Sequence, residues 1–151
     1  MTAHAVVRQD MPASCEAVFD LVHDYPRRLE WDTLLRSAET VDGVAPGPGV
    51  EAVCRARWGL GGLAFRTRYV TFHRPGLAAI VLVGTTPVFR TWAASIRHRP
   101  LPDGRSEAVY TLTFTCRPAL LAPVLEPVAL LAFRWETRRR LRALAAHLAR
   151  G

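Results

Sequence analysis

The sequence contains no lysine. All 20 basic residues are arginine, and 13 acidic residues leave a formal net charge of +7. The arginines are scattered in pairs, with one cluster near the C-terminus, which is more typical of a solvated surface than of a nucleic-acid-binding patch. An RNP-like aromatic motif, a zinc-finger spacing and a helix-turn-helix pattern are also missing. We therefore expect no nucleic-acid partner.

Long hydrophobic runs are absent as well. No stretch reaches the roughly 18 to 20 uninterrupted apolar residues that a membrane-spanning helix needs. The N-terminal stretch MTAHAVVRQDM has no apolar segment of the kind found in signal peptides. The three cysteines, Cys15, Cys54 and Cys116, are far apart and outside any CxxC motif. They are expected to be free, buried thiols, and these features together predict a cytoplasmic protein.

Motifs for metal binding or nucleophilic catalysis are missing too. The five histidines are far apart, and neither HxH nor HxxxH occurs. GxSxG does not occur, and WGLGG (58–62) is interpreted as a hairpin turn rather than a phosphate-binding loop. We expect no metal and no cofactor.

What is present suits one folded domain. Half of the 151 residues are hydrophobic and 22% are charged, so residues 1–151 are predicted to form a single domain with one core. Residues 3–10 are predicted to form a strand. Ser14 is a favourable N-cap for a helix that ends near His23, and a short helical turn ends near Trp31.

Between residues 34 and 117, apolar residues alternate with polar ones in six segments separated by short Gly- and Pro-rich turns. This pattern predicts consecutive antiparallel strands. After Pro118 the period becomes helical, and we expect a helix from about 119–128 to about 149, packed across the sheet. Pro127 predicts either a bend in that helix or its start.

The order of elements resembles the helix-grip fold of the START/Bet v 1-like (SRPBCC) superfamily, including the bacterial polyketide cyclase/dehydrase group. Three stretches carry the resemblance: MPASCEAVFDLVHDYPRRLEWDTLLRSAETVDG, PGVEAVCRA and RWETRRRLRALAAHLA. The resemblance implies an α+β fold in which a curved antiparallel β-sheet wraps around a long C-terminal α-helix. It also implies a cavity between the sheet and that helix.

Alternation along the strands predicts which side chains face the helix. The candidate ligand-binding residues are Trp58, Phe65, Tyr69, His73, Arg90, Trp92, Tyr110 and Phe114. They suit a mostly apolar ligand with a few polar contacts. The alternative is a filled core made of the same residues. For Arg90, a position at the rim of the sheet is an alternative, and for His73 a structural hydrogen bond is one.

These observations lead to three functional hypotheses. The first is binding, and transport in some settings, of a hydrophobic small molecule such as a lipid or polyketide. The second is a polyketide aromatase/cyclase-type enzyme acting in the same cavity, although carboxylates are scarce on the inferred inner face. The third is a purely structural or interaction module with a filled core. The apolar segment 120–135 is followed by arginines that are interpreted as a solvated helix end, with transient contact to an anionic membrane surface as the alternative.

Overall fold

The computed structural model describes residues 3–60 and 62–150, so Gly61 of the expected 58–62 turn lies outside the described residues. Here η marks a short 3-10 helix. The elements are, in order, β1 (Ala3–Met11), α1 (Cys15–Val22), η1 (Tyr25–Glu30), β2 (Leu35–Thr40), η2 (Val41–Gly43), β3 (Glu51–Ala56), η3 (Trp58–Leu60), β4 (Ala64–His73), β5 (Leu77–Leu82), β6 (Phe89–Pro100), η4 (Pro102–Gly104), β7 (Ser106–Cys116) and α2 (Ala122–Arg150).

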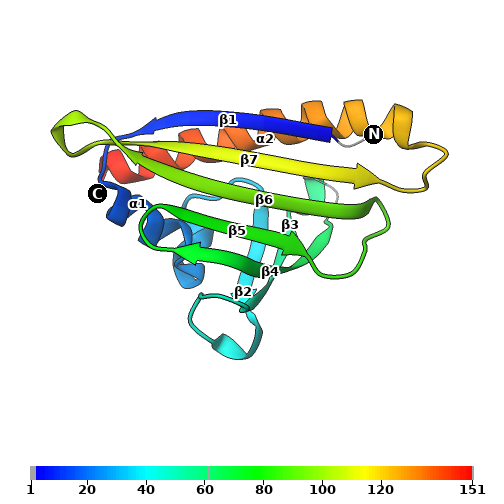
Figure 1. Ribbon diagram of the computed structural model, residues 1–151, viewed down its shortest axis with the longest axis horizontal. Helices are drawn as coiled ribbons and strands as arrows, with labels where there is room; N and C mark the ends of the chain where they lie inside the picture. Colours follow the sequence, from blue (N-terminus) through cyan, green and yellow to red (C-terminus); the bar gives the residue numbers. More distant parts are fainter. Residues whose placement is uncertain (1–2, 61, 151) are drawn as a thin grey trace.

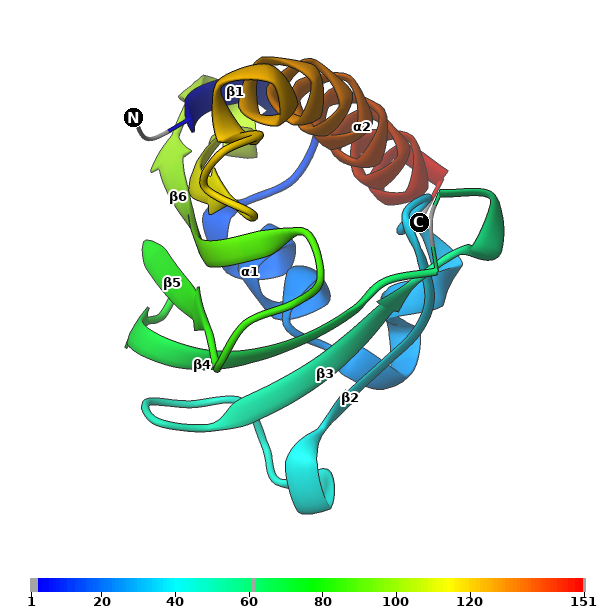
Figure 2. The same cartoon turned by 90° about the vertical axis from the view of Figure 1, so that its right-hand side faces the viewer.

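All seven strands form one antiparallel sheet in the order β1-β7-β6-β5-β4-β3-β2. The sheet curves around α2, which lies along β1 and β7, while α1 and η1 lie inside the curve (Figures 1 and 2). The helix-grip arrangement is confirmed, as is the start of the C-terminal helix between residues 119 and 128. Among the described residues, no helix is both long and apolar enough to cross a membrane.

The first helix forms where its sequence predicts. The side-chain oxygen of Ser14 accepts a hydrogen bond from the backbone N–H of Ala17 at 3.2 Å, which satisfies one free donor of the first turn. Val18, Phe19 and Val22 are buried on one face. The helix therefore packs against the inner face of the curved sheet. It places the segment after it, residues 23–34, on that same inner face.

Three strands contain a register shift. One lies in β2 between Leu35 and Ser37, and those in β4 and β6 reverse the alternation of side chains that the sequence predicts. In β4 the shift lies between Tyr69 and Thr71, so that Phe72 packs on the core and His73 is exposed. In β6 it lies between Phe89 and Thr91, so that Phe89 is buried. An extra residue in one strand moves every later side chain to the opposite face.

The core consists of two apolar clusters that meet in the middle of the sheet. One contains residues of α1 and the C-terminal half of α2, such as Phe19 and Leu144. The other contains residues of β6 and β7, with Phe133 of α2 packed against it. Ile80 and Tyr110 touch both clusters, so the space between the clusters lies near these two residues.

Candidate functional site

An inner cavity of about 80 Å³ lies between the sheet and α2, where the two core clusters meet. Six Phe, Tyr and Trp side chains from five elements contribute to its wall: Tyr25 from η1, Phe65 and Tyr69 from β4, Trp92 from β6, Tyr110 from β7 and Phe133 from α2. The wall is therefore mostly apolar, which suits burial of a hydrophobic ligand.

Small side chains on the sheet leave this space open. Cys54 of β3, Ala78 of β5 and Ala94 of β6 all line the cavity. Phe133 of α2 lines the same cavity, and the short side chains on the strands leave space beside it. Small residues at these strand positions thus favour a cavity.

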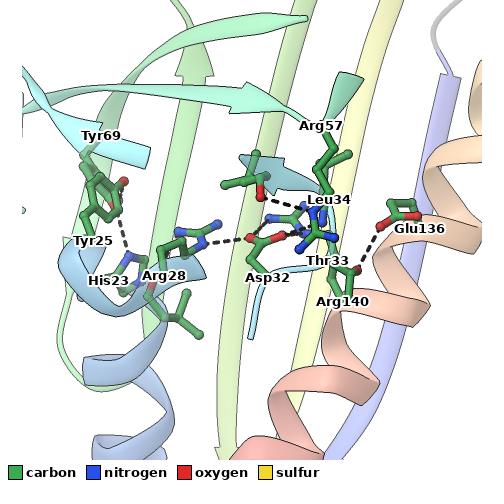
Figure 3. A network of polar contacts seen from close by, with 12 residues as sticks. His23, Tyr25, Arg28, Asp32, Thr33, Leu34, Arg57, Tyr69, Glu136 and Arg140 are labelled. Atoms are coloured by element: carbon green, nitrogen blue, oxygen red, sulfur yellow. Dashed lines mark hydrogen bonds and ion pairs between the residues drawn. The ribbon is translucent and has the colours of Figure 1, made fainter. Parts of the chain in front are cut away.

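A buried charged cluster borders the cavity, and Asp32 is at its centre (Figure 3). Its carboxylate accepts two hydrogen bonds from Arg140, Nε to Oδ1 at 3.0 Å and an Nη to Oδ2 at 2.9 Å. It accepts one from Arg28 Nε at 2.8 Å and one from the backbone N–H of Leu34 at 3.0 Å. Both arginines line the inner cavity. Three charged groups are therefore held together beside an apolar space.

The two guanidinium groups keep Asp32 ionised. Burial by itself would raise the pKa of Asp32, but Arg140 and Arg28 outweigh burial and lower the pKa to about 2. In turn, Asp32 raises the pKa of both arginines against the effect of their burial. Two positive charges and one negative charge leave the cluster with one net positive charge. An oxygen anion in the cavity would compensate that charge.

A chain of neutral polar groups lies beside the charged cluster. The hydroxyl of Tyr69 is 2.7 Å from His23 Nδ1 and 2.7 Å from the hydroxyl of Tyr25 (Figure 3). Burial, reinforced by the positive charge of Arg28, lowers the pKa of His23 to about 3, so its imidazole is neutral at pH 7. Burial and the Tyr25 hydroxyl raise the pKa of Tyr69 above its usual value. All three groups are therefore uncharged.

These groups separate the inner cavity from a larger outer cleft. The cleft has a volume of about 660 Å³ and lies between α1 and the segment 38–46. His23 and Tyr25 line both spaces. A molecule that passes from the cleft into the cavity must therefore move past these two side chains.

Two buried polar atoms near the cavity have no hydrogen-bond partner among the described residues. They are Nε1 of Trp92 and Nε2 of His23, and both side chains line the cavity. A buried polar group without a partner is costly, so each of them favours a ligand or water that supplies one.

The eight sequence-predicted site residues fall into three groups. Phe65, Tyr69, Trp92 and Tyr110 line the inner cavity. Phe114 points inward but is fully buried against Phe89 and Phe133. It belongs to a filled part of the core and is absent from the cavity wall. The cavity and the filled core, which the sequence offered as alternatives, thus occupy neighbouring parts of the same sheet.

The inward orientation predicted for Trp58, His73 and Arg90 is wrong. β3 ends at Ala56, and Trp58 is 76% exposed, with the Arg36 guanidinium 4.0 Å from the centre of its ring. The register shifts in β4 and β6 leave His73 and Arg90 exposed. For Arg90 the structure agrees with the alternative position at the rim.

Sequence reasoning missed His23, Tyr25, Arg28, Asp32 and Arg140. Four of them lie in the segment between α1 and β2, whereas only strand residues were considered for the inner face. Arg140 was assigned to a solvated helix end, yet only 8% of it is exposed. A signal was present, because Arg140 follows Thr137 by three residues and precedes Leu144 by four, on the buried face of α2.

Comparison with solved structures shows the same fold in several proteins of low sequence identity. The Zhui aromatase/cyclase from Streptomyces sp. R1128 has a TM-score of 0.82 at 15% identity, covering 99% of this chain and 95% of that one. A START superfamily protein from Mycobacterium smegmatis has a TM-score of 0.76 at 13% identity, covering 98% of both chains. For norcoclaurine synthase from Thalictrum flavum the TM-score is 0.74 at 9% identity, covering 100% of this chain and 88% of that one.

A search of curated proteins finds no match. The family model described as "Polyketide cyclase / dehydrase and lipid transport" matches residues 2–149, nearly the whole chain. Together with the curved sheet, the long C-terminal helix and the cavity between them, this match establishes that the chain belongs to the polyketide cyclase/dehydrase and lipid transport family.

Proposed function

We propose that this protein binds a hydrophobic small molecule that carries one anionic or strongly hydrogen-bond-accepting oxygen group. The apolar part of the ligand contacts the aromatic wall of the inner cavity, and the oxygen group contacts Arg28 and Arg140. One observation carries the proposal: two guanidinium groups share the single carboxylate of Asp32 at the edge of an apolar cavity. A buried net charge favours a compensating counter-charge.

The volume of the cavity limits how the ligand binds. The cavity measures about 80 Å³, whereas pockets for drug-sized ligands measure roughly 300–1,000 Å³. The inner cavity therefore accepts only one end of a larger ligand, namely its oxygen group and the apolar atoms next to it. The rest extends toward the outer cleft, which requires the side chains of His23 and Tyr25 to move.

The test compares an anionic and a neutral fluorescent probe, 1-anilinonaphthalene-8-sulfonate and 1-aminoanthracene. We expect Arg28→Gln to weaken binding of the anionic probe by about tenfold or more, because a hydrogen bond to a charged group is lost. Binding of the neutral probe should change little. The matched control is Arg27→Gln, since Arg27 is the neighbouring residue but is exposed and pairs with Glu30.

Equal weakening of both probes by Arg28→Gln would contradict the anionic group, and failure of both probes to bind wild type would contradict the cavity site. Native mass spectrometry of freshly purified protein provides a second measurement, because a co-purified ligand would report its own mass.

The second candidate function is a polyketide aromatase/cyclase-type enzyme. The observation that favours it is the contact of His23 with Tyr69 at the inner end of the outer cleft, beside two arginines that would polarise a ligand carbonyl. The pKa of His23 argues against it, since a general base works best with a pKa near the operating pH. Ring closure of a poly-β-keto substrate that is lost in His23→Gln but retained in Arg27→Gln would favour the enzyme over the binder.

A further inference from the structure

The N-terminal half of α2 has an apolar face that is turned away from the protein. The exposed residues of this half and of the position directly before it are Leu121, Pro123, Val124, Pro127, Val128, Leu131, Ala132 and Trp135. None of them is charged. Leu120, in the turn before the helix, is 88% exposed. We call this set of residues the outer face of α2, and Figure 2 shows α2 at the periphery of the molecule, where it closes the open side of the curved sheet.

The outer face is not needed for the core. The opposite side of the same helix supplies Leu125, Ala129, Leu130 and Phe133 to the second apolar cluster. A helix on the surface of a water-soluble protein normally has polar residues on its solvent side. Here, over residues 122–135, which span about 21 Å of helix at 1.5 Å per residue, every exposed side chain is apolar, for example Leu131 (67% exposed).

The negative charges of α2 are both buried. Its carboxylates are Glu126 and Glu136, and both are buried. Glu126 accepts a hydrogen bond from the backbone N–H of Cys116 at 2.8 Å, and Glu136 accepts one from Thr33 Oγ1 at 2.9 Å. Consequently the helix presents no negative charge to the outside among its described residues.

The outer face continues into exposed arginines. Arg138, Arg139 and Arg142 are exposed and follow Trp135 by three, four and seven residues, which places them on the same side of the helix. The Arg139 guanidinium lies 5.5 Å from the centre of the Trp135 ring. Trp is favoured where an apolar region meets a charged one at a membrane interface. We include these three arginines in the outer face of α2, which is therefore apolar along its first half and positive along its second.

We propose that the outer face of α2 docks on an anionic lipid bilayer. The apolar half contacts the acyl-chain boundary, and Arg138, Arg139 and Arg142 contact negatively charged headgroups. A second copy of this chain is a poorer partner, because a symmetric dimer would join two faces that both lack carboxylates. Only a surface that is both apolar and negative complements the two halves.

The test is co-sedimentation of the purified full-length protein with vesicles of phosphatidylcholine alone and of phosphatidylcholine mixed with phosphatidylglycerol. We expect binding to the mixed vesicles, weakened by added salt, and little binding to the zwitterionic ones. The double variant Val128→Glu/Leu131→Glu should bind at least about tenfold more weakly, since it places charge at the acyl-chain boundary. Its control is Val70→Glu, because Val70 is 55% exposed on β4, far from α2 in sequence.

A second pair of variants tests the positive half. Arg142→Glu should weaken binding to the mixed vesicles by about fivefold or more. The exposed Arg97 of β6 provides the control Arg97→Glu. Circular dichroism confirms that each variant is folded.

Three outcomes would overturn the proposal. The first is that the wild-type protein does not bind the mixed vesicles. The second is that the α2 variants and their controls lose vesicle binding equally. The third is that the wild-type protein is a dimer without vesicles and that Val128→Glu/Leu131→Glu dissociates it. The last would show that a second copy covers the outer face. None of these results depends on the cavity ligand, so a failure here leaves the proposed ligand-binding function intact.

Discussion

Arg140 and Asp32 are 108 residues apart in the sequence, yet they form a two-point ion pair with N–O distances of 3.0 and 2.9 Å. The pair joins α2 to the segment that follows η1. Asp32 Oδ2 also accepts a hydrogen bond from Arg28 Nε at 2.8 Å. One carboxylate therefore links α2 to Arg28 at the start of the segment 28–32 as well as to its own position at the end. These contacts fix one side of the inner cavity.

Asp32→Ala is expected to destabilise the protein by about 3–5 kcal/mol, because two buried guanidinium groups lose their shared carboxylate. Urea unfolding monitored by circular dichroism measures the change. The control is Asp20→Ala, since Asp20 pairs with Arg74 on the surface with both side chains about half exposed and should cost no more than about 1 kcal/mol. A loss for Asp32→Ala as small as that of the control would contradict the central role of this carboxylate.

Stability should fall when the pH drops below the ordinary histidine range. Burial lowers the pKa of His98 to about 4, and burial with the charge of Arg28 lowers that of His23 to about 3. Between pH 6 and 4.5 the unfolded chain binds a proton at both sites while the folded chain binds neither. The free energy of unfolding should therefore decrease with falling pH by up to about 2.7 kcal/mol per pH unit.

The variant His98→Gln should reduce this slope to about 1.4 kcal/mol per pH unit, since only His23 then contributes. Urea titrations at closely spaced pH values measure it. A free energy of unfolding that is constant between pH 6 and 4.5 would show that the two imidazoles are protonated in the folded protein.

Trp92→Ala and Phe114→Ala should separate the cavity wall from the filled core. Phe114 is fully buried between Phe89 and Phe133, and its removal should cost about 3–5 kcal/mol. Trp92 contacts Phe65 and Phe133 on one side but faces the cavity on the other. Trp92→Ala should therefore lower the free energy of unfolding less than Phe114→Ala does. It should lower the affinity for 1-aminoanthracene more than Phe114→Ala does. The opposite ranking in unfolding and probe titrations would mean that Trp92 is an ordinary core residue.

Cys54 should report on occupation of the cavity. All three cysteines are free; Cys54 lines the inner cavity, and burial raises the pKa of its thiol. We expect slow labelling of Cys54 and Cys116 by a thiol reagent in the native protein and fast labelling after unfolding. Saturating 1-aminoanthracene should slow the labelling of Cys54 further but leave that of Cys116 unchanged. Equal protection of both would point to a global effect on stability.

Several parts of this structure could be predicted because their signals are local. The change from a period of two to a helical period after Pro118 predicts α2, and Ser14 predicts the start of α1 through its hydrogen bond to Ala17. Alternation along β7 is uninterrupted, so Tyr110 and Phe114 face inward as predicted. In β4 and β6 the same reasoning succeeds only on one side of each register shift, because the extra residue leaves no mark in the alternation itself.

The sequence by itself determined the order of the elements, the antiparallel pairing and the presence of apolar and small residues on the inner face of the sheet. These properties follow from residue periodicity and from turns between neighbouring segments. The tertiary structure alone decided which residues form the candidate site. Arg28, Asp32 and Arg140 form one charged cluster only when α2 crosses the segment after η1. Their proximity depends on how distant segments of the chain pack together. Periodicity within one segment carries no information about that packing.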